Sequence, residues 1–259
     1  MNNYKKGVKH GWDAMSRWYQ DESIISVKEV HYSPFAPGED TFKLLGDVSG
    51  KMILELGCGA AHNAISLAGN GARVTAVDFS EQQLQHALEL TAKEKSSVDL
   101  IQGDIEEVAY FRNRTFDIIL SVFALEFVPD ITTFMEECYR VLVPGGILVV
   151  STTHPLSAFE WAEVDRCLVI DNYFHPPVEI WKEDGQIGKD KGVTFFRTVE
   201  ELFESMSRVG FRIDKLIEPV AMPQEEISRS PYRGPYWEAQ WERFSSIPFA
   251  VLFRGLKPE

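Results

Sequence analysis

The sequence predicts an α/β fold in which a doubly wound, mostly parallel sheet carries helices on both faces. Short apolar segments alternate with amphipathic segments along most of the chain, which is typical of repeated strand–helix–strand crossovers. One apolar segment, Met52–Leu56, stops at Gly57-Cys58-Gly59 before a helical pattern begins, and a glycine turn there is typical of a nucleotide-binding unit. The next apolar segment ends in an acid, Asp78, as expected of the strand beside such a ligand.

Residues 1–50 precede this unit and are expected to form an N-terminal cap segment. A short helix is predicted from about Gly11 to Gln20. Its aromatic residues suit either core packing or a flap over a bound ligand, with Tyr19 as the contact. The proline-rich and aromatic stretch at 31–39 predicts a loop, and a helix at Asp40–Leu45 follows it.

The first two strands of the sheet are predicted at Met52–Leu56 and Arg73–Asp78. The helix between them should run from the glycine turn to about Asn70. Ser80-Glu81-Gln82-Gln83 matches a capping box, which starts the next helix. The third strand is predicted at Val98–Gln102.

The fourth strand is predicted at Phe116–Phe123, because a nearly uniform apolar segment is typical of a strand buried on both faces. A helix from Pro129-Asp130 to Leu142 follows, with apolar residues at i, i+3 and i+4 spacing. Pro144-Gly145-Gly146 is expected to end that helix, and Ile147–Ser151 is the fifth strand.

The alternation breaks at about 155–197, a stretch rich in aromatic residues that we interpret as an inserted lid. A turn signal at Asp184-Gly185 suggests a hairpin between Val178 and Phe196. The sequence therefore predicts one Rossmann-like domain at 51–259 that contains this insertion. After the lid, the predicted elements are a helix that a second capping box starts, Thr198–Val209, and an antiparallel pair of strands, Phe211–Ile217 and Ile247–Arg254.

The composition excludes several classes of function. The chain has 259 residues, of which 44% are hydrophobic and 25% charged, as in an ordinary globular protein. A net charge of −13 opposes broad binding to nucleic acid or to an anionic membrane surface. The three cysteines lack CxxC or CxxxC spacing, which predicts neither a metal site nor a disulfide framework. No secretory signal or membrane span is evident, so the predicted location is cytoplasmic, and a monomer and a homodimer both stay open.

Asp78 is the strongest candidate for binding a ligand. It lies 19 residues after Gly59 and closes its strand, where a carboxylate can accept hydrogen bonds from both hydroxyls of a ribose. The alternative role is a helix-capping acid, although Ser80 already supplies that cap. Phe79 follows directly and could cover an adenine face or pack in the core.

Two further acids lie at or near the ends of strands. Asp104 follows the third strand and could accept from an adenine amino group, with Ile105 lending its backbone N–H and an apolar contact. The alternative for Asp104 is a plain turn aspartate. Glu55 lies within the apolar first strand, where a buried carboxylate is costly without a partner. A cationic ligand or buried N–H groups would provide that partner.

The glycine turn argues against dinucleotides and nucleoside triphosphates. The dinucleotide fingerprint is G-x-G-x-x-G/A, whereas the sixth position here is His62. A bulky ring there would push the helix away from a pyrophosphate, but a ligand without phosphate can accept it. The sequence also lacks the GxxxxGK[ST] motif of a P-loop.

Five motifs, in this order and spacing, resemble the successive motifs of class I S-adenosylmethionine-dependent methyltransferases: ILELGCG, VTAVDFS, QGDIEEV, TFDIILSVFALEFV and LVPGGILVVSTTHP. The resemblance is strong over about residues 40–152 and loose over 198–254. It implies a sheet of seven strands in the order 3-2-1-4-5-7-6, with the seventh antiparallel. It also implies S-adenosyl-L-methionine as the cofactor and S-adenosyl-L-homocysteine as its product. One departure is Ala61, where the family usually has a third glycine.

The resemblance implies a role for individual residues as well. Those at the first turn, Gly57, Cys58 and Gly59, would pass close to the methionine part of the cofactor, with Glu55 near its amino group. The other roles would be the ribose for Asp78, the adenine for Asp104 and Ile105, and the sulfonium for the strand end from Ser121 to Phe123.

Methyl transfer is expected to be an in-line displacement at the sulfonium methyl, for which the protein supplies orientation and a dry site. For acceptors that need a base, His154 lies just after the fifth strand, and its ordinary pKa suits proton removal near neutrality. A structural His-Pro turn is the alternative role for His154. Glu126, after the fourth strand, and His31, in the aromatic loop, are weaker candidates.

The nature of the acceptor follows from two observations. The [DN]PP[YFW] signature of amino methylation on nucleobases is absent, because Ser121-Val122-Phe123-Ala124 stands in its place. The aromatic lid favours a small apolar or aromatic acceptor. The sequence thus predicts a small-molecule methyltransferase. Two alternatives stay open: an NAD(P)-dependent oxidoreductase, opposed by His62 and by the lack of a Tyr-x-x-x-Lys pair, and a non-catalytic S-adenosylmethionine-binding protein.

Overall fold

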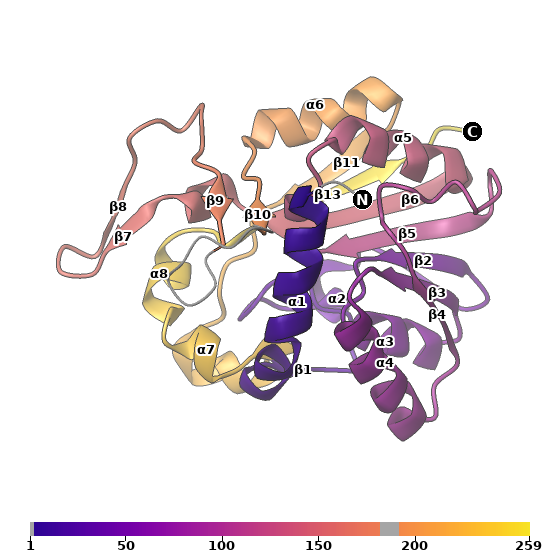
Figure 1. The fold of residues 1–259 in the computed structure, drawn as a ribbon, viewed down its shortest axis with the longest axis horizontal. Coiled ribbons are helices and arrows are strands. Elements are labelled where there is room, and N and C mark those ends of the chain that lie inside the picture. Colours follow the sequence, from indigo (N-terminus) through magenta and orange to yellow (C-terminus); the bar gives the residue numbers. More distant parts are fainter. Residues whose placement is uncertain (1–2, 182–191) are drawn as a thin grey trace.

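A computed structural model describes residues 3–181 and 192–259 of the chain. Its centre is a seven-stranded sheet (Figure 1). In spatial order the strands are β4 (Val98–Gln102), β3 (Arg73–Asp78), β2 (Met52–Leu56), β5 (Phe116–Val122), β6 (Leu142–Thr153), β13 (Ala250–Leu256) and β11 (Arg212–Ile217). The first five run parallel, and β13 is antiparallel to both of its neighbours. In order along the chain this is 3-2-1-4-5-7-6, so the predicted fold class is confirmed.

Helices cover both faces of the sheet (Figure 1). One face carries α2 (Glu39–Phe42), α3 (His62–Gly69) and α4 (Glu81–Glu94), and the other carries α5 (Ile131–Val141) and α6 (Val199–Val209). Successive side chains of a strand point to opposite faces. Accordingly, Ile53 packs in one buried cluster with Leu67, whereas Leu54 packs in the other with Phe134 and Met206. The sheet is buried on both sides, as its apolar strands predicted.

The start of β6, which was predicted as the fifth strand, differs from the prediction. The glycines of Pro144-Gly145-Gly146, expected to end a helix, lie inside β6, because α5 already ends at Val141 and the strand begins with Leu142. Leu142 pairs with Phe116. The Gly145 N–H donates to the Lys257 carbonyl over 2.8 Å, and the Lys257 N–H donates to the Gly146 carbonyl over 2.9 Å. These long-range hydrogen bonds, which are not visible in local sequence, hold the segment in the sheet.

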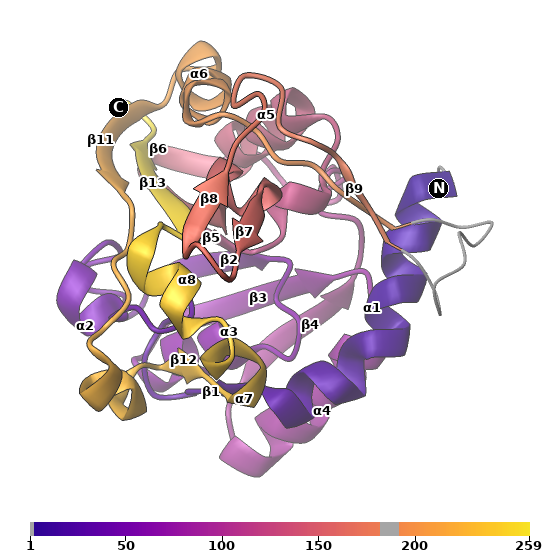
Figure 2. The ribbon, with the colours of Figure 1, turned by 90° about the vertical axis from the view of Figure 1, so that its left-hand side faces the viewer.

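The first helix is also longer than predicted. α1 (Asn3–Glu22) includes the expected segment from Gly11 to Gln20 and extends it at both ends. It crosses the ends toward which the parallel strands point and lies beside α4 (Figures 1 and 2). The polar contacts that hold it there include Lys5 Nζ to Asp104 Oδ2 at 2.6 Å, Ser80 Oγ to Asp13 Oδ1 at 2.7 Å, and Gln20 Nε2 to Gln83 Oε1 at 3.1 Å.

Short elements form the insertion that we interpret as a lid. The 3-10 helix η2 (Pro155–Ala158) leads into a hairpin of β7 (Glu160–Ala162) and β8 (Cys167–Val169). A second ladder pairs β9 (Glu179–Ile180) with β10 (Val193–Thr194). This ladder confirms the base of the hairpin expected between Val178 and Phe196. The expected turn at Asp184-Gly185 lies outside the described residues.

The segment before β13 covers the same end of the molecule as the N-terminal residues. It contains η3 (Gln224–Arg229), β12 (Tyr232–Arg233), α7 (Pro235–Glu238) and α8 (Trp241–Ser246). β12 pairs antiparallel with β1 (Ile24–Ile25), which follows α1. A buried cluster joins the two segments, formed by Phe35, Ile227, Tyr232, Trp237 and Phe244. The N-terminal residues and the segment before β13 therefore pack together over the same end of the molecule (Figure 2).

Of the two predicted capping boxes, one is complete. At α6, Thr198 Oγ1 accepts from the Glu201 N–H over 3.2 Å, and Glu201 Oε2 accepts from the Thr198 N–H over 2.8 Å. At α4, Ser80 Oγ accepts from the Gln83 N–H over 3.1 Å, but the Ser80 N–H donates to Asp78 instead of Gln83. The carboxylate that closes β3 has replaced the second half of that box.

We expect Thr198→Ala to lower the free energy of unfolding by about 1 kcal/mol, because the helix loses a side-chain acceptor for its first turn. Thr198→Ser keeps that acceptor and should stay close to the wild type. Urea denaturation measures both variants, and equal destabilisation by the two substitutions would contradict the role of the hydroxyl.

Candidate functional site

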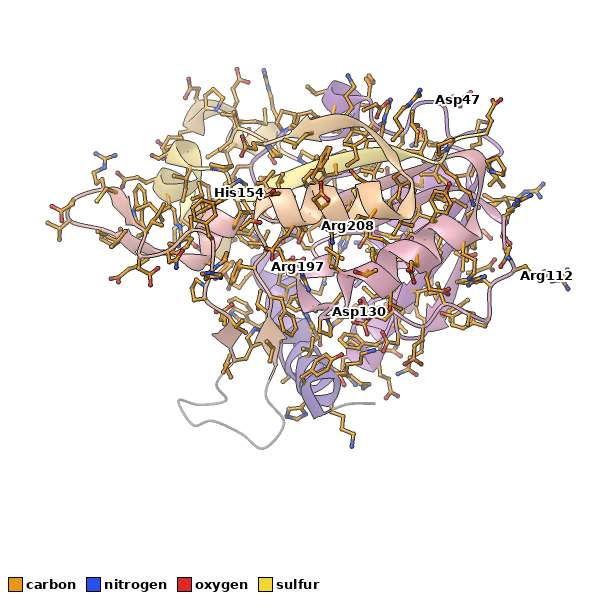
Figure 3. All side chains as sticks on the ribbon, turned by 90° about the horizontal axis from the view of Figure 1, so that it is seen from above. Asp47, Arg112, Asp130, His154, Arg197 and Arg208 are labelled. Carbon is orange, nitrogen blue, oxygen red and sulfur yellow. The ribbon has the colours of Figure 1, made fainter. Side chains whose placement is uncertain are left out.

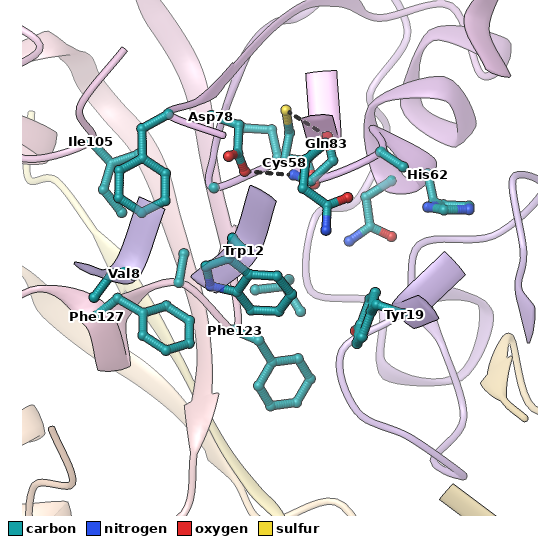
Figure 4. Close-up of a pocket in the computed structure, with 18 of the residues that line it drawn as sticks. Val8, Trp12, Tyr19, Cys58, His62, Asp78, Gln83, Ile105, Phe123 and Phe127 are labelled. Atoms are coloured by element: carbon teal, nitrogen blue, oxygen red, sulfur yellow. Dashed lines mark hydrogen bonds between the residues drawn. The ribbon is translucent and has the colours of Figure 1, made fainter. Parts of the chain in front are cut away.

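A cavity of about 130 Å³ lies where β2, β3, β4 and β5 end, beneath α1 (Figure 4). The strand order reverses between β2 and β5, and in doubly wound sheets ligands bind in the crevice at such a reversal. Five side chains of α1 close the cavity from above: Lys5, Val8, Trp12, Tyr19 and Gln20.

The glycine turn after β2 forms one wall of this cavity. Gly57 and Gly59 have positive φ angles of 78° and 51°, which side chains rarely adopt. A Cβ atom on Gly57 would also overlap the Cβ of Ala124 at the end of β5. Ala61, where a third glycine was expected from the family pattern, shares this backbone region with a φ of 64°.

Asp78 fixes the shape of that turn. Its Oδ2 accepts from the Gly59 N–H and its Oδ1 from the Ser80 N–H, both over 2.8 Å. Burial raises the pKa of Asp78 to about 6, against the opposing effect of these hydrogen bonds. The carboxylate lines the cavity, so both proposed roles, contact with a ligand and organisation of the chain, are compatible in one residue.

Glu55 also lines the cavity and is almost completely buried. Burial raises its pKa to about 8, although hydrogen bonding from Ala64 opposes the shift. Within the described residues, Glu55 Oε2 has no hydrogen-bond partner. A buried carboxyl oxygen without a partner is costly, and a ligand that donates hydrogen bonds or carries positive charge would satisfy it.

The end of β4 holds an ion cluster that the sequence did not predict. Lys5 pairs with Asp104 and with Glu106, and Asp104 Oδ1 accepts from the Glu106 N–H over 3.0 Å. Burial alone would lower the pKa of Lys5, but hydrogen bonds to the two acids and their charges outweigh it and raise that pKa. Asp104 therefore shares its carboxylate between the cavity and α1.

The opposite part of the cavity is aromatic. Trp12 meets Phe127 edge-on at 5.7 Å between ring centroids and Tyr19 at 5.4 Å. Phe123 follows β5 directly with a φ of 53°, and its ring lies 6.4 Å from that of Tyr232. Figure 4 shows Trp12, Tyr19, Phe123 and Phe127 around the cavity, with Asp78 and Cys58 in its polar part. The cavity thus offers acids to one portion of a ligand and rings to another.

His31 places a polar imidazole ring in the aromatic part of the cavity. Its backbone is held by Asn63 of α3, because the His31 N–H donates to Asn63 Oδ1 over 2.9 Å and Asn63 Nδ2 donates to the His31 carbonyl over 3.3 Å. The ring lies 4.8 Å from that of Tyr232. Burial, followed by the proximity of His62, lowers the pKa of His31 to about 3. The imidazole is consequently neutral at physiological pH.

The other two candidate bases lie outside the cavity wall. His154 (Figure 3) accepts from the Leu156 N–H at Nδ1 and contacts Glu218 through Nε2 over 2.9 Å. Both ring nitrogens are therefore occupied, and the ring caps η2. Glu126, within η1 (Leu125–Phe127), is buried and accepts from the hydroxyls of Thr152 and Thr153. Burial raises the pKa of Glu126 to about 7.

The cavity brings together most of the residues expected to bind the cofactor: Tyr19, Glu55, Gly57, Cys58, Gly59, Asp78, Phe79, Asp104, Ile105 and Phe123. Ser121 is not among the lining residues. It is fully buried, and its hydroxyl donates to the Leu56 carbonyl over 3.0 Å, which joins β5 to β2.

The cavity wall also contains four residues that were not predicted from the sequence: Lys5, Val8, Trp12 and Phe127. A signal for the first three existed. Lys5, Val8, Trp12 and Tyr19 recur three, four and seven residues apart, which places them on one face of a helix. Phe127 carries no comparable signal, since only the fold brings η1 against Trp12.

The described part of the chain contains no cluster of three or more His, Cys, Asp or Glu residues suited to a metal ion. Over the same residues, the longest helices are too short or too polar to cross a bilayer.

Comparisons with known proteins agree with this geometry. A family model described as a methyltransferase domain matches residues 54–150. The chain is similar to a demethylmenaquinone methyltransferase of Lactococcus lactis, with 33% identity over 120 residues that make up 44% of this chain and 47% of that protein. It is similar to a ubiquinone biosynthesis O-methyltransferase of Salmonella newport, with 31% identity over 162 residues, or 59% and 66% of the two chains. The chain thus spans less than two thirds of the length of either relative.

A solved structure covers more of the chain. The S-adenosylmethionine-dependent methyltransferase of Mesorhizobium loti has a TM-score of 0.67 and 25% identity, over 83% of this chain and 94% of that one. These similarities do not favour the oxidoreductase alternative.

We expect Glu55→Gln to change how stability depends on pH. The folded pKa of about 8 lies above the ordinary value of 4.5, so between these values the folded protein binds more protons than the unfolded chain, and its stability falls as pH rises. Glutamine cannot ionise. The variant's free energy of unfolding, relative to the wild type, should therefore increase from about pH 5 to about pH 8. Urea denaturation without ligand measures this.

The matched control is Glu94→Gln, because Glu94 is exposed at the end of α4. Its difference from the wild type should not vary with pH over this range. A constant difference for Glu55→Gln as well would contradict the raised pKa.

Proposed function

Because the chain belongs to the class I S-adenosylmethionine-dependent methyltransferases, we propose that it transfers a methyl group to a small acceptor with an aromatic ring. The division of the cavity is the observation that carries this proposal. Acids line the part at the ends of β2, β3 and β4, and Trp12, Phe123 and Phe127 line the part beside β5. The names of the relatives in demethylmenaquinone and ubiquinone biosynthesis support a ring-containing acceptor.

The residues present suit S-adenosylmethionine, the cofactor of this family. The unpartnered Glu55 Oε2 would accept from its ammonium group, and Asp78 would bind the ribose. Phe79, Asp104 and Ile105 would hold the adenine. Among the described residues that line the cavity, Lys5 is the one lysine or arginine, and two acids already pair with it. This donor set suits a ligand without phosphate.

In the reaction, the bound cofactor supplies an electrophilic methyl group on a sulfonium. The chain's own residues position the acceptor and exclude water. α1 covers the cavity and holds Trp12 and Tyr19 against it, while Trp181, at the base of the lid, packs at 5.4 Å from Phe127 and 6.1 Å from Trp12. A dry, closed site favours transfer to the acceptor over reaction with water.

We also propose that nucleic acid is not the acceptor. A net charge of −13 opposes binding to phosphate backbones, and the one lysine of the cavity is neutralised by Asp104 and Glu106. A cytoplasmic location, an N-terminal cap at 1–50 and a monomer or homodimer stay predictions of the sequence.

A methyl-transfer assay tests the proposed function. We expect purified protein to form S-adenosyl-L-homocysteine when S-adenosyl-L-methionine is supplied with simple phenols or hydroquinones, and to form much less with aliphatic alcohols of similar size. Mass spectrometry detects S-adenosyl-L-homocysteine and the methylated acceptor. Binding of the cofactor with no turnover on any acceptor would instead support a non-catalytic binding protein.

We expect Asp78→Ala to weaken the binding of S-adenosyl-L-homocysteine by at least ~2 kcal/mol, because the ribose loses charge-assisted hydrogen bonds. Isothermal calorimetry measures the affinity. Asp99→Ala is the matched control, since Asp99 is exposed on the neighbouring strand β4.

Asp78 also organises the glycine turn, so thermal unfolding should accompany the measurement. Asp78→Asn keeps the shape of the side chain and one acceptor, and we expect an intermediate loss. Unchanged affinity in Asp78→Ala would contradict the ribose assignment.

A further inference from the structure

We propose that His31 binds the acceptor by accepting a hydrogen bond from a hydroxyl group on its ring, and that this hydroxyl oxygen is the atom methylated. The inference rests on the function proposed above. It narrows the acceptor from aromatic molecules in general to phenols, hydroquinones and related hydroxylated rings.

The His31 side chain is part of the cavity wall, and its Nδ1 has no hydrogen-bond partner among the described residues. The residue is 8% exposed. Buried polar groups in folded proteins are nearly always satisfied, so an unsatisfied one at a ligand site indicates a partner that the ligand supplies.

The position of His31 in the cavity wall is fixed. Two hydrogen bonds tie its backbone to Asn63 of α3, and the packing against Tyr232 holds the ring. Asn63 is itself buried in the first turn of that helix. A rigid backbone and a packed ring reduce the entropy that ordering the contact would cost.

His31 lies beside the aromatic part of the cavity. The ring packs against Tyr232, whose ring also lies near Phe123, at the aromatic part of the cavity. The acids that suit the cofactor, Asp78 and Asp104, belong to the ends of β3 and β4. His31 therefore lies on the side that we assign to the acceptor.

The chemistry of a neutral imidazole suits this contact. A neutral imidazole offers a lone pair to a hydroxyl proton, and burial keeps His31 neutral. In the transfer, the hydroxyl oxygen forms a bond to the methyl carbon, and the carbon–sulfur bond breaks with its electron pair on sulfur. The hydroxyl proton is held in the hydrogen bond to His31 while the new bond forms, and it is then released to water. Neither His154 nor Glu126 lines the cavity to take this role.

The test compares phenol with toluene, which have the same shape but differ by a hydroxyl in place of a methyl. Both are titrated into protein saturated with S-adenosyl-L-homocysteine, and binding is followed by NMR on protein with ¹⁵N-labelled histidine. We expect the wild type to bind phenol about tenfold more tightly than toluene, as one hydrogen bond to an otherwise unsatisfied group provides. Phenol should also shift a ring nitrogen resonance of His31.

Two variants isolate the contact. His31→Phe keeps a ring and removes both nitrogens, so the preference for phenol should vanish while the affinity for S-adenosyl-L-homocysteine stays within about twofold of the wild type. His31→Gln restores a hydrogen-bond acceptor and should recover part of the preference. His86→Phe, on α4 and outside the cavity wall, is the matched control and should retain it in full. Thermal unfolding checks that each variant folds.

The outcomes separate the two proposals. Equal phenol preference in the wild type and in His31→Phe, or no binding of either probe, would overturn the role of His31 while leaving the methyltransferase function intact. A tenfold loss of S-adenosyl-L-homocysteine affinity in His31→Phe would also overturn it, because His31 would then belong to the cofactor site. Methylated phenol recovered as cresol instead of anisole would overturn the oxygen assignment. Failure of the wild type to bind S-adenosyl-L-homocysteine would overturn the proposed function itself.

Discussion

One carboxylate, that of Asp78, connects the parts on which the rest of the site depends. It accepts hydrogen bonds from Gly59, in the turn after β2, and from Ser80, at the start of α4. The turn after β2 and the turn between β3 and α4 are thereby held in fixed positions relative to each other. Ser80 in turn donates to Asp13 of α1. The helix that closes the cavity is thus joined through the side chains of Ser80 and Asp78 to the turn that forms one of its walls.

Local patterns determine much of this fold. β2, β3 and β4 begin and end where their apolar residues, the glycine turn and the closing acids predicted. The helix cap at Thr198 was equally readable, because a capping box needs only residues three positions apart. The order of the strands came from the resemblance to a family, since no local rule specifies which strands become neighbours.

The parts that sequence reasoning missed depend on contacts between distant segments. α1 begins before Lys5, and Lys5 pairs with Asp104 and Glu106. These partners lie 99 and 101 positions further along the chain, so local sequence does not reveal them. The placement of the candidate bases is a similar case. His154 and His31 both stand beside prolines or aromatic residues in the sequence. Only the fold gives both ring nitrogens of His154 a partner and leaves Nδ1 of His31 without one among the described residues. Burial of individual side chains is a tertiary property, and periodicity does not reveal it.

Gly11 allows the backbone of α1 to pack closely against the indole of Trp181. A Cβ atom at Gly11 would lie 2.6 Å from the indole of Trp181, so the backbone of α1 passes directly under the base of the lid. Trp181 also packs against Trp12, which faces the cavity. A side chain at position 11 would therefore push the helix and the indole apart, and Trp12 would lose the aromatic contact that Trp181 provides.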